Sequence, residues 1–437
     1  MTAQIFPIER NLDALSVAQI IATELPYVHA FYPQTDRLHK DVQQWLDFFI
    51  QHKQHLPMYG MRESCADALM TQMTQYHAML LAALRQILKL DVETVRQWFP
   101  CKASADPAFV AFFEYARHEF FRQTPYTMNS STIYGRFDAV IEPESGKLEG
   151  IYEFNGDTPV MLFESVNLQN LIATALGKGE SQANDWWLLA QEHFAAYRDK
   201  NIAVVCDVGF IEDASTTETI AQLFESVGAQ VYFTTLEGLN HSVLELEQPF
   251  MVDGVATRPD VIFMLLPWEE MWISGKDILA HWPNWNNTVQ FLEPAWRWFM
   301  SHKGLFAWVT HLLDEDSGFK ERWQHLPHLH TTLSPDYFVQ AGLDYVSKPA
   351  IGRLSQNIRI HQGNTVSQQT GGQYQDESRV YQQYLPPHQV HGRPNFILGG
   401  WLSGQKVSTL CFREFDGPVL DLKNERFIAH LLLDTES

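Results

Sequence analysis

The spacing of the apolar residues changes at about residue 126, and this change constrains the possible folds of the chain more than any other feature. From about residue 13 to 125, apolar side chains recur every three or four residues, as at Leu69, Met73 and Tyr76. This period is typical of amphipathic helices, and few β-branched residues oppose it. We therefore expect residues 1–125 to form a helical N-terminal region.

From Ser131 the pattern becomes that of short strands. The runs Ile133–Ile141 and Leu148–Phe154 flank a turn at Pro143–Gly146 and predict a β-hairpin. Strands and helices then alternate, which indicates an open α/β sheet with parallel neighbouring strands. We expect residues 126–275 to hold the hairpin and this α/β subdomain. The elements predicted after the hairpin are a strand at Asn201–Asp207, a helix at Thr216–Val227 and strands at Gln230–Thr234 and Pro259–Leu266.

The C-terminal region, residues 276–437, begins with a helical stretch at about 290–313 and continues with strands. We expect these strands to form one mixed sheet. The polar segment His361–Arg379, rich in Gln, Gly and Ser, is predicted to be a mobile excursion between two of them. The predicted strands are Tyr345–Lys348, Ile358–Ile360, Val380–Tyr384, Asn395–Gly400 and Lys406–Arg413.

The charge of the chain excludes one class of principal partner. The 437 residues include 52 acidic and 31 basic side chains, and the formal net charge is −21. Binding to duplex nucleic acid draws most of its affinity from Lys and Arg at the phosphates, so we expect no nucleic-acid partner. An anionic ligand would need basic residues gathered locally.

The chain is expected in the cytoplasm. Its first residues include acidic side chains where a signal peptide has a basic start, and no apolar core of such a peptide follows. The longest apolar runs, such as Val261–Trp268, are far shorter than a membrane span, so we expect no membrane partner. The cysteines form no CxxC pair, which favours buried, reduced thiols over disulfides or a zinc site. They are Cys65, Cys101, Cys206 and Cys411.

The predicted hairpin carries the most informative polar residues. Because side chains alternate along a strand, Arg136 and Asp138 share one face of the first strand. Glu153 and Asn155 share one face of the second. If these faces meet, two carboxylates and an amide oxygen converge beside a guanidinium, a donor set that suits Mg²⁺ and a phosphate. The alternative is an ordinary amphipathic hairpin with a solvated polar face.

Three further segments could contact a nucleotide. Lys348 ends an apolar strand and precedes a turn with Gly352, so its ammonium could reach a phosphate, although a strand-end lysine is commonly a solvated edge residue. The strand ending at Leu385 could offer main-chain groups to an adenine edge, or could simply stop at the following prolines. Arg413 is either an anion clamp or a surface charge, and Lys303 is either a helix-surface lysine or a second phosphate contact.

Common catalytic motifs of other classes are absent from the sequence. GxxxxGK[ST], GxGxxG, GxSxG and HExxH are not found, so P-loop, dinucleotide-binding, serine hydrolase and zinc protease chemistry lack their carriers. The tightest histidine cluster, formed by His325, His328 and His330, contains no cysteine or carboxylate and is interpreted as a plain loop.

Taken together and in this order, the segments resemble the glutathionylspermidine synthetase family, in particular its ATP-grasp-like synthetase domain and the related stand-alone acid–amine ligases. The resemblance implies an ATP-grasp-like synthetase fold, of mixed α+β and α/β class, with a preceding α/β subdomain and an N-terminal helical layer. The matching blocks span nearly two-thirds of the chain. They are RFD at Arg136–Asp138, YEFNGDTP at Tyr152–Pro159, PWE at Pro267–Glu269, HK at His302–Lys303, SKPAIGR at Ser347–Arg353, VYQQYLP at Val380–Pro386 and TLCFRE at Thr409–Glu414.

The resemblance also implies roles for the matching residues. Arg136 would be the catalytic cation that contacts the transferring γ-phosphate, and Glu269 and Arg413 would face the acid or amine substrate. The magnesium ligands would be Asp138, Glu153 and Asn155. The residues around ATP would be Arg136, Phe137, Asp138, Lys303, Lys348, Gly352, Ser355, Gln383 and Leu385.

The implied activity is the ADP-forming ligation of a carboxylic acid to an amine through an acyl phosphate, with ATP as cosubstrate and two Mg²⁺ ions as cofactor. A polyamine is one possible amine, since the negative net charge mildly favours a cation. The first 125 residues show no Cys–His arrangement, so the amidase activity of bifunctional members is not expected. The segment Gly156–Leu162 is poorer in serine than the glutathione-using branch, which argues against glutathione as the acid.

Two other functions stay open on the sequence, namely a nucleotide-binding module without turnover and a small-molecule kinase. Substitution with alanine at Asp138 or Glu153 is expected to abolish ADP formation with little change in thermal stability. Ser347→Ala is expected to matter far less than Lys348→Ala.

Overall fold

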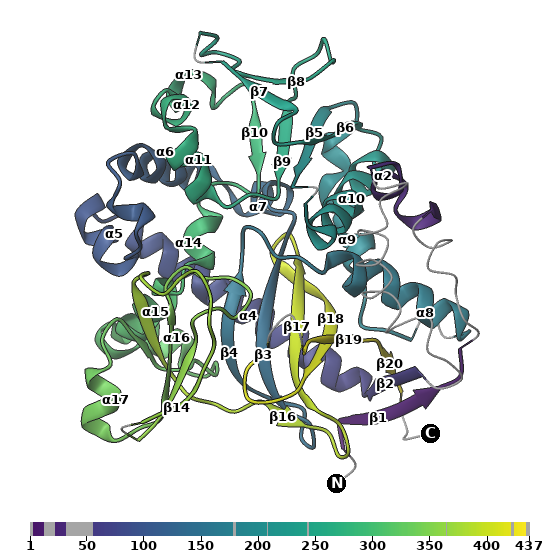
Figure 1. The fold of residues 1–437 in the computed structure, drawn as a ribbon, viewed down its shortest axis with the longest axis vertical. Coiled ribbons are helices and arrows are strands. Elements are labelled where there is room, and N and C mark those ends of the chain that lie inside the picture. The colour runs from purple at the N-terminus through teal and green to yellow at the C-terminus, as the bar shows by residue number, and fades with distance from the viewer. Residues whose placement is uncertain are drawn as a thin grey trace.

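The computed structural model describes residues 3–12, 22–31, 56–177, 181–207, 209–242, 244–363, 365–420 and 424–433. Within these residues, five β-sheets and their covering helices are arranged around one central sheet (Figure 1). The fold class is as expected, with mixed helix and sheet and an α/β unit. Among the described helices, none has both the length and the apolar composition needed to cross a membrane.

The central sheet is antiparallel and contains the predicted hairpin, which is confirmed. Its strand order is β19-β18-β17-β3-β4, with β16 paired to β17. The long helix α4 (Glu63–Ile87) packs against this sheet, and its Tyr76 ring meets Phe137 of β3 edge-on at 5.9 Å. The strands are β3 (Tyr134–Glu142), β4 (Lys147–Asn155), β16 (His388–Gln389), β17 (Asn395–Ser403), β18 (Lys406–Phe415) and β19 (Arg426–Ile428).

The α/β unit is also confirmed. Its four strands are parallel in the order β10-β9-β5-β6, and α10 (Ile211–Ser226) connects β5 to β6. The continuous apolar runs of the sequence are typical of strands covered on both faces, and all four residues of β9 are buried. The strands are β5 (Asn201–Cys206), β6 (Gln230–Thr235), β9 (Val261–Met264) and β10 (Gln290–Leu292), and β7 (Leu239–His241) pairs separately with β8 (Phe250–Val252).

The expectation of one mixed C-terminal sheet is wrong, because its strands belong to two sheets. β17 and β18 lie in the central sheet, whereas the others form an antiparallel sheet of order β11-β15-β12-β13-β14. The polar segment expected as an excursion contains β14, whose five residues are all exposed. Such a strand has no buried side and therefore no apolar alternation to reveal it. The strands are β11 (Thr331–Thr332), β12 (Tyr345–Pro349), β13 (Arg359–Gln362), β14 (Thr365–Gln369) and β15 (Arg379–Gln383).

The N-terminal region is largely helical but also contributes strands. β2 (Leu56–Met61) lies inside the segment predicted to be helical, where it pairs with β1 and, in parallel, with β20 near the C-terminus. Because β20 is distant in sequence, local spacing could not reveal this pairing. Residues 13–21 and 32–55 of the same segment lie outside the described residues. The remaining elements are β1 (Ile5–Arg10), β20 (His430–Leu432), α2 (Pro26–Phe31), α5 (Val92–Trp98), α6 (Phe109–Arg122) and α7 (Pro125–Ser131).

The helical stretch expected at about 290–313 is interrupted. It begins with β10, and α14 (Arg297–Ser301) and α15 (Gly304–Glu315) are separated at His302–Lys303. This break places Lys303 beside the central hairpin. The remaining helices are α8 (Gln169–Ala175), α9 (Trp186–Phe194), α11 (Trp268–Ser274), α12 (Lys276–Ala280), α13 (Trp282–Trp285), α16 (Ser317–Trp323) and α17 (Asp336–Ala341).

The four cysteines are buried free thiols, as expected. The division of the chain at residues 125 and 275 stays a prediction. The central sheet takes β3 and β4 from before residue 275 and β17 to β19 from after it, so the two parts share one hydrophobic core.

Candidate active site

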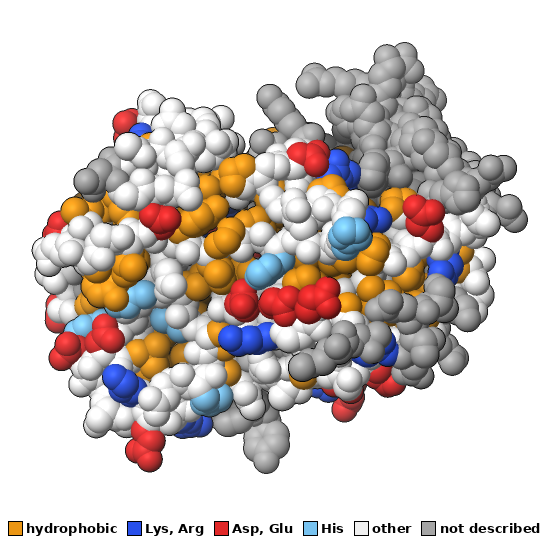
Figure 2. Space-filling model, turned by 90° about the horizontal axis from the view of Figure 1, so that it is seen from below, with side chains coloured by type: hydrophobic (Ala, Val, Ile, Leu, Met, Phe, Trp, Pro, Cys, Tyr) orange, Lys and Arg blue, Asp and Glu red, His pale blue; other side chains and the backbone are white. Residues whose placement is uncertain are grey.

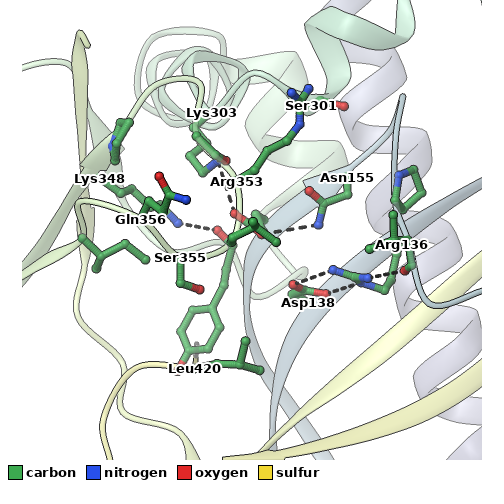
Figure 3. A pocket seen from close by; sticks show the side chains of 18 of the residues that line it. Arg136, Asp138, Asn155, Ser301, Lys303, Lys348, Arg353, Ser355, Gln356 and Leu420 are labelled. Atoms are coloured by element: carbon green, nitrogen blue, oxygen red, sulfur yellow. Dashed lines mark hydrogen bonds and ion pairs between the residues drawn. The ribbon is translucent and has the colours of Figure 1, made fainter. Parts of the chain in front are cut away.

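A cavity of about 710 Å³ lies between the central sheet and the antiparallel sheet (Figure 3). This volume is within the range of small-molecule sites. Lys303 and Lys348 lie on one side of it, and Arg136, Asp138 and Asn155 on the other. The residues singled out from the sequence that line the cavity are Arg136, Asp138, Glu153, Asn155, Glu269, Lys303, Lys348, Gly352, Ser355, Gln383, Leu385 and Arg413.

The hairpin register brings the predicted polar residues face to face. Asp138 lies directly opposite Glu153, and Arg136 lies opposite Asn155. The two carboxylates, the amide and the guanidinium therefore reach the same side of the sheet, because each pair is related by the two-residue period of its strand.

Phe137 lies elsewhere, and its assignment to the nucleotide site is corrected. Its ring is fully buried on the opposite face of β3, 4.5 Å from the ring of Phe154. Successive side chains of a strand point to opposite faces, so a residue between Arg136 and Asp138 must face the core.

Asp138 is held by two arginines. Its Oδ1 accepts from Arg136 Nε at 2.8 Å, and its Oδ2 lies 2.6 Å from Arg413 NH2. All three side chains are buried. Burial opposes ionisation of the carboxyl, but the two guanidinium groups outweigh it and lower the pKa of Asp138 to about 2. The carboxylate is therefore charged throughout the physiological pH range.

Two buried lysines face the hairpin. Lys303 Nζ lies 3.3 Å from Glu153 Oε2 and donates to the carbonyl of Gly352 at 3.2 Å. Lys348 Nζ donates to the carbonyl of Tyr152 at 2.8 Å. Burial lowers the pKa of Lys348 to about 8, while Glu153 opposes this shift and Lys303 adds to it. Two cations held at the wall of a cavity are suited to bind a multiply charged anion.

The side chains of Asp138, Glu153 and Asn155 supply the oxygen donors that Mg²⁺ prefers. Asn155 Nδ2 donates to Glu153 Oε1 at 3.3 Å, so amide and carboxylate are adjacent. Burial and the charge of Asp138 oppose ionisation of Glu153, but Lys303 outweighs them and the pKa of Glu153 is lowered. Among the described residues, no group of three His, Cys, Asp or Glu side chains forms a metal site. Mg²⁺ needs only one or two carboxylates, so the donor set fits it.

The segment expected to meet adenine borders an apolar part of the cavity. Tyr152 donates its hydroxyl to the carbonyl of Leu385 at 2.6 Å, which ties this segment to the hairpin. Ile397, Phe415 and Leu420 form a small apolar cluster against Tyr152, and all of them line the cavity. An apolar wall beside free main-chain groups can bury a planar base.

The loop at residues 350–358 forms another wall of the cavity. Leu354, Ser355 and Asn357 have φ angles of 57°, 53° and 56°, a backbone region that residues other than glycine adopt rarely. The hydroxyl of Thr370 donates to the carbonyl of Ser355 at 2.6 Å and holds the loop. Gly352, Arg353 and Ser355 reach the cavity from this loop.

Glu269 faces the cavity as expected and pairs with an arginine that the sequence did not single out. Arg353 NH2 lies 3.4 Å from Glu269 Oε1, and Trp298 Nε1 donates to Glu269 Oε2 at 2.8 Å. Burial raises the pKa of Glu269, although Arg353 opposes the shift. The position of Arg353 in the SKPAIGR block was a signal for it.

Further acidic residues line the cavity without any local signal in the sequence. Glu212 and Asp213 lie in the first turn of α10, and Glu425 and Asp157 lie in loops. Burial together with neighbouring carboxylates raises the pKa of Glu212 and of Asp213 to about 7. Only the packing of α10 against the central sheet brings them to the site, so spacing along the chain could not predict them.

Comparison with known proteins yields a family. A family model described as glutathionylspermidine synthase preATP-grasp matches residues 56–433. A protein of Haemophilus influenzae that carries the provisional name acid–amine ligase is 25% identical over 329 residues, covering 70% of this chain and 76% of that protein.

Two other relatives are more distant. Trypanothione synthetase of Crithidia fasciculata is 22% identical over 311 residues, which cover 64% of this chain and 44% of that protein, so the match spans less than half of its length. The structure of a glutathione synthetase-like effector from Globodera pallida has a TM-score of 0.47 and 10% identity, covering 86% of this chain and 89% of that one.

Proposed function

The chain belongs to the glutathionylspermidine synthase preATP-grasp family, and on that premise we propose that it is an ATP-dependent ligase that joins a carboxylic acid to an amine. The observation that carries the proposal is the cavity in which two buried lysines and two buried arginines surround a pair of opposed carboxylates. A triphosphate with its metal is a ligand that needs both signs of charge at one place.

The basic residues would bind and orient the phosphates. Lys303 and Lys348 would contact them from one wall, and Arg136 would stabilise the charge that develops on the transferring γ-phosphoryl group. Preorganised charges of this kind are typically worth about 10²–10³ in rate for each donor. Asp138, Glu153 and Asn155 would hold Mg²⁺, which supplies charge neutralisation between the phosphates. Gly352 and Ser355 would cover the phosphates, and Gln383 and Leu385 would border the adenine.

The reaction would run through an acyl phosphate. A carboxylate oxygen of the acid attacks the γ-phosphorus, the bond to the bridging oxygen breaks, and ADP leaves. The amine nitrogen then attacks the acyl carbon, phosphate leaves, and the nitrogen loses a proton to form the amide. Water must be kept away from the acyl phosphate, and the loop at residues 350–358 is the part of the cavity wall that we assign to this task.

The acidic wall favours a cationic amine. Glu212, Asp213 and Glu425 line the part of the cavity near Arg413, and Glu269 lies beside Arg353. Carboxylates there can hold an ammonium group by charge and accept its proton as it becomes a nucleophile. Arg413 and Glu269 are therefore proposed to face the acid and the amine. The amine is proposed to be a polyamine, and the place of action the cytoplasm.

The test is ADP release from Mg·ATP with a panel of carboxylic acids and spermidine as the first amine. The proposal expects ADP release that requires both an acid and an amine and that Glu153→Gln abolishes. Glu63→Gln, an exposed glutamate of α4, serves as the matched control and should keep full activity.

Three outcomes would contradict the proposal. Release of AMP would indicate adenylation of the acid. Tight binding of Mg·ATP without turnover on any pair would indicate a nucleotide-binding module. A phosphorylated product that resists hydroxylamine would indicate a small-molecule kinase, because hydroxylamine captures acyl phosphates.

A further inference from the structure

A row of polar side chains crosses three strands of the antiparallel sheet and ends at Lys348. Thr331 of β11 lies directly opposite Gln382 of β15. Gln382 lies opposite Val346 of β12, so Lys348, two residues further along β12, is its diagonal neighbour. Residues two apart on a strand share a face, and diagonal neighbours are within reach of long side chains. Thr331, Gln382 and Lys348 are therefore aligned across the sheet on one face.

The three side chains are joined by hydrogen bonds. Lys348 Nζ donates to Gln382 Oε1 at 2.9 Å, and Gln382 Nε2 donates to Thr331 Oγ1 at 3.2 Å. Each of these residues is buried, with relative exposures of 6% for Lys348, 2% for Gln382 and 1% for Thr331. Buried hydrogen bonds to a charged group are stronger than average and fix geometry.

The direction of the Gln382 amide follows from the next bond in the row. The Thr331 hydroxyl donates its one proton to the carbonyl of Leu329 at 2.8 Å. Its oxygen can therefore only accept from Gln382, which must present its NH₂ group there. The carbonyl oxygen of the amide is consequently turned toward Lys348. An acceptor at that point suits an ammonium.

Thr331 is itself anchored to the helical layer. Its main-chain N–H donates to Thr310 Oγ1 of α15 at 2.9 Å, and that hydroxyl lies 2.9 Å from His328 Nε2. His328 Nδ1 lies 2.7 Å from the hydroxyl of Tyr76 on α4. The histidine cluster that the sequence suggested to be a plain loop thus contains one buried member in a polar network. Burial lowers the pKa of His328 to about 3, so the ring is neutral.

Lys348 keeps one proton for a ligand. An ammonium has three N–H donors, and the carbonyls of Tyr152 and Gln382 take two of them. Among the described residues, no third acceptor bonds to Lys348, and its side chain lines the cavity. The two bonds hold the stem and the nitrogen, so the third N–H has one preferred direction. Figure 3 shows Lys348 on the cavity wall together with Lys303 and Arg353.

We propose that Gln382 is a positioning residue for nucleotide binding, which fixes the Lys348 ammonium so that its remaining N–H meets a phosphate of ATP. This inference rests on the proposed function, since it takes the anion in the cavity to be a nucleotide phosphate. Gln382 acts through Lys348 alone and is aligned by Thr331. Side chains that are held in this way lose less entropy when the ligand binds.

The experiment is calorimetric binding of Mg·AMP-PNP to the full chain in a double-mutant cycle. Gln382→Met has nearly the same length without an acceptor, and we expect about tenfold weaker binding, the usual effect of losing a hydrogen bond to a charged group. Lys348→Met should weaken binding further. In the Lys348→Met background, Gln382→Met should have no additional effect, because residues that act as one unit are not additive.

Two further variants complete the design. Thr331→Val removes the acceptor that orients the amide while keeping the side-chain shape, and it should weaken binding less than Gln382→Met. It also keeps the test available if Gln382→Met fails to fold. Gln368→Met places the same substitution on exposed β14, and it should bind as the wild type does.

The outcomes separate the two levels of the argument. If the wild type binds Mg·AMP-PNP but the effects of Gln382→Met and Lys348→Met add, or if neither Gln382→Met nor Thr331→Val weakens binding, the positioning role is refuted while the proposed function stands. If neither the wild type nor Gln368→Met binds the nucleotide, both the positioning role and the proposed function are overturned.

Discussion

Asp138 is a structural ion-pair partner as well as a proposed metal ligand. The sequence alone suggests that alanine there removes activity and spares stability. In the structure the carboxylate lies between Arg136 and Arg413, and all three are buried. Removing it leaves two guanidinium groups in the interior without their partner, which is strongly destabilising.

Asp138→Ala should therefore lower the free energy of unfolding by about 3–5 kcal/mol at pH 7, as measured by urea denaturation. The pKa of Asp138 is lowered to about 2, so its stabilising contribution is complete above the ordinary pKa of 3.8 and is lost as the pH falls through 2. A variant with unchanged unfolding would show that the two arginines do not depend on this carboxylate.

Lys348 gives the proposed nucleotide site a basic pH limit. Its pKa is lowered to about 8, so the ammonium loses its proton as the pH rises through 8 and the phosphate contact is lost. The KM for ATP should rise above pH 8 in the wild type. Lys348→Arg, which stays charged at such pH, should remove this rise even if its KM is higher at pH 7. A rise of equal size in Lys348→Arg would assign the limit to another group.

At the scale of residues, strand alternation predicted part of the site and failed for a clear reason elsewhere. Arg136, Asp138, Glu153 and Asn155 share faces because they lie two apart on paired strands, and the structure places them so. Glu212 has no such mark, since it reaches the cavity through the packing of α10. Side chains brought together by tertiary packing leave no period in the sequence.

At the scale of elements, the short helix α14 holds the turn that follows β4. Ser301, its last residue, accepts from the main-chain N–H of Gly156 at 2.7 Å and of Asp157 at 3.0 Å, and donates to Asp157 Oδ1 at 2.6 Å. Arg297 of the same helix donates to the carbonyl of Gly156 at 2.6 Å. These bonds fix the turn directly after Asn155.

Ser301→Ala should lower the free energy of unfolding by about 1–3 kcal/mol, because two main-chain N–H groups lose their acceptor. Rates of ADP release should fall as well, since Asn155 is no longer held in place. Ser317→Ala, at the exposed first residue of α16, is the control and should match the wild type in both measurements. A Ser301 variant as stable and active as this control would refute the role of α14.

The elements that the sequence predicts best are those with a local signal. The hairpin and the β5-α10-β6 unit follow from runs and turns of nearby residues. β2 and β14 escape prediction, the first because its partner β20 lies at the other end of the chain, the second because it is polar on both sides. Both cases show tertiary context overriding local pattern.

At the scale of the whole molecule, the acidic composition is partly internal. Figure 2 shows acidic side chains beside basic and hydrophobic ones on one face of the surface. Other carboxyl groups are withdrawn from water, and burial raises their pKa values to about 7. They are Glu119, Glu212, Asp213, Glu218 and Glu293.

The stability of the protein should consequently fall as the pH rises toward neutrality. A carboxyl whose folded pKa is raised contributes stability that is complete below its unfolded pKa, 4.5 for Glu, and that is lost as the pH rises through about 7. Urea denaturation at pH 6 and pH 8 should give a higher free energy of unfolding at pH 6. Glu119→Gln, which removes one such group, should make this dependence shallower. Equal stability at the two pH values would contradict the raised pKa values.

The central claim is that one cavity binds a nucleotide triphosphate between the hairpin carboxylates and the two lysines. A crystal structure of the protein with AMP-PNP and Mn²⁺ in place of Mg²⁺ tests it most directly. We predict an anomalous peak beside Asp138, Glu153 and Asn155, with the γ-phosphate within hydrogen-bonding distance of Lys303 or Lys348. A nucleotide bound outside this cavity, or a metal peak away from the hairpin, would contradict the account.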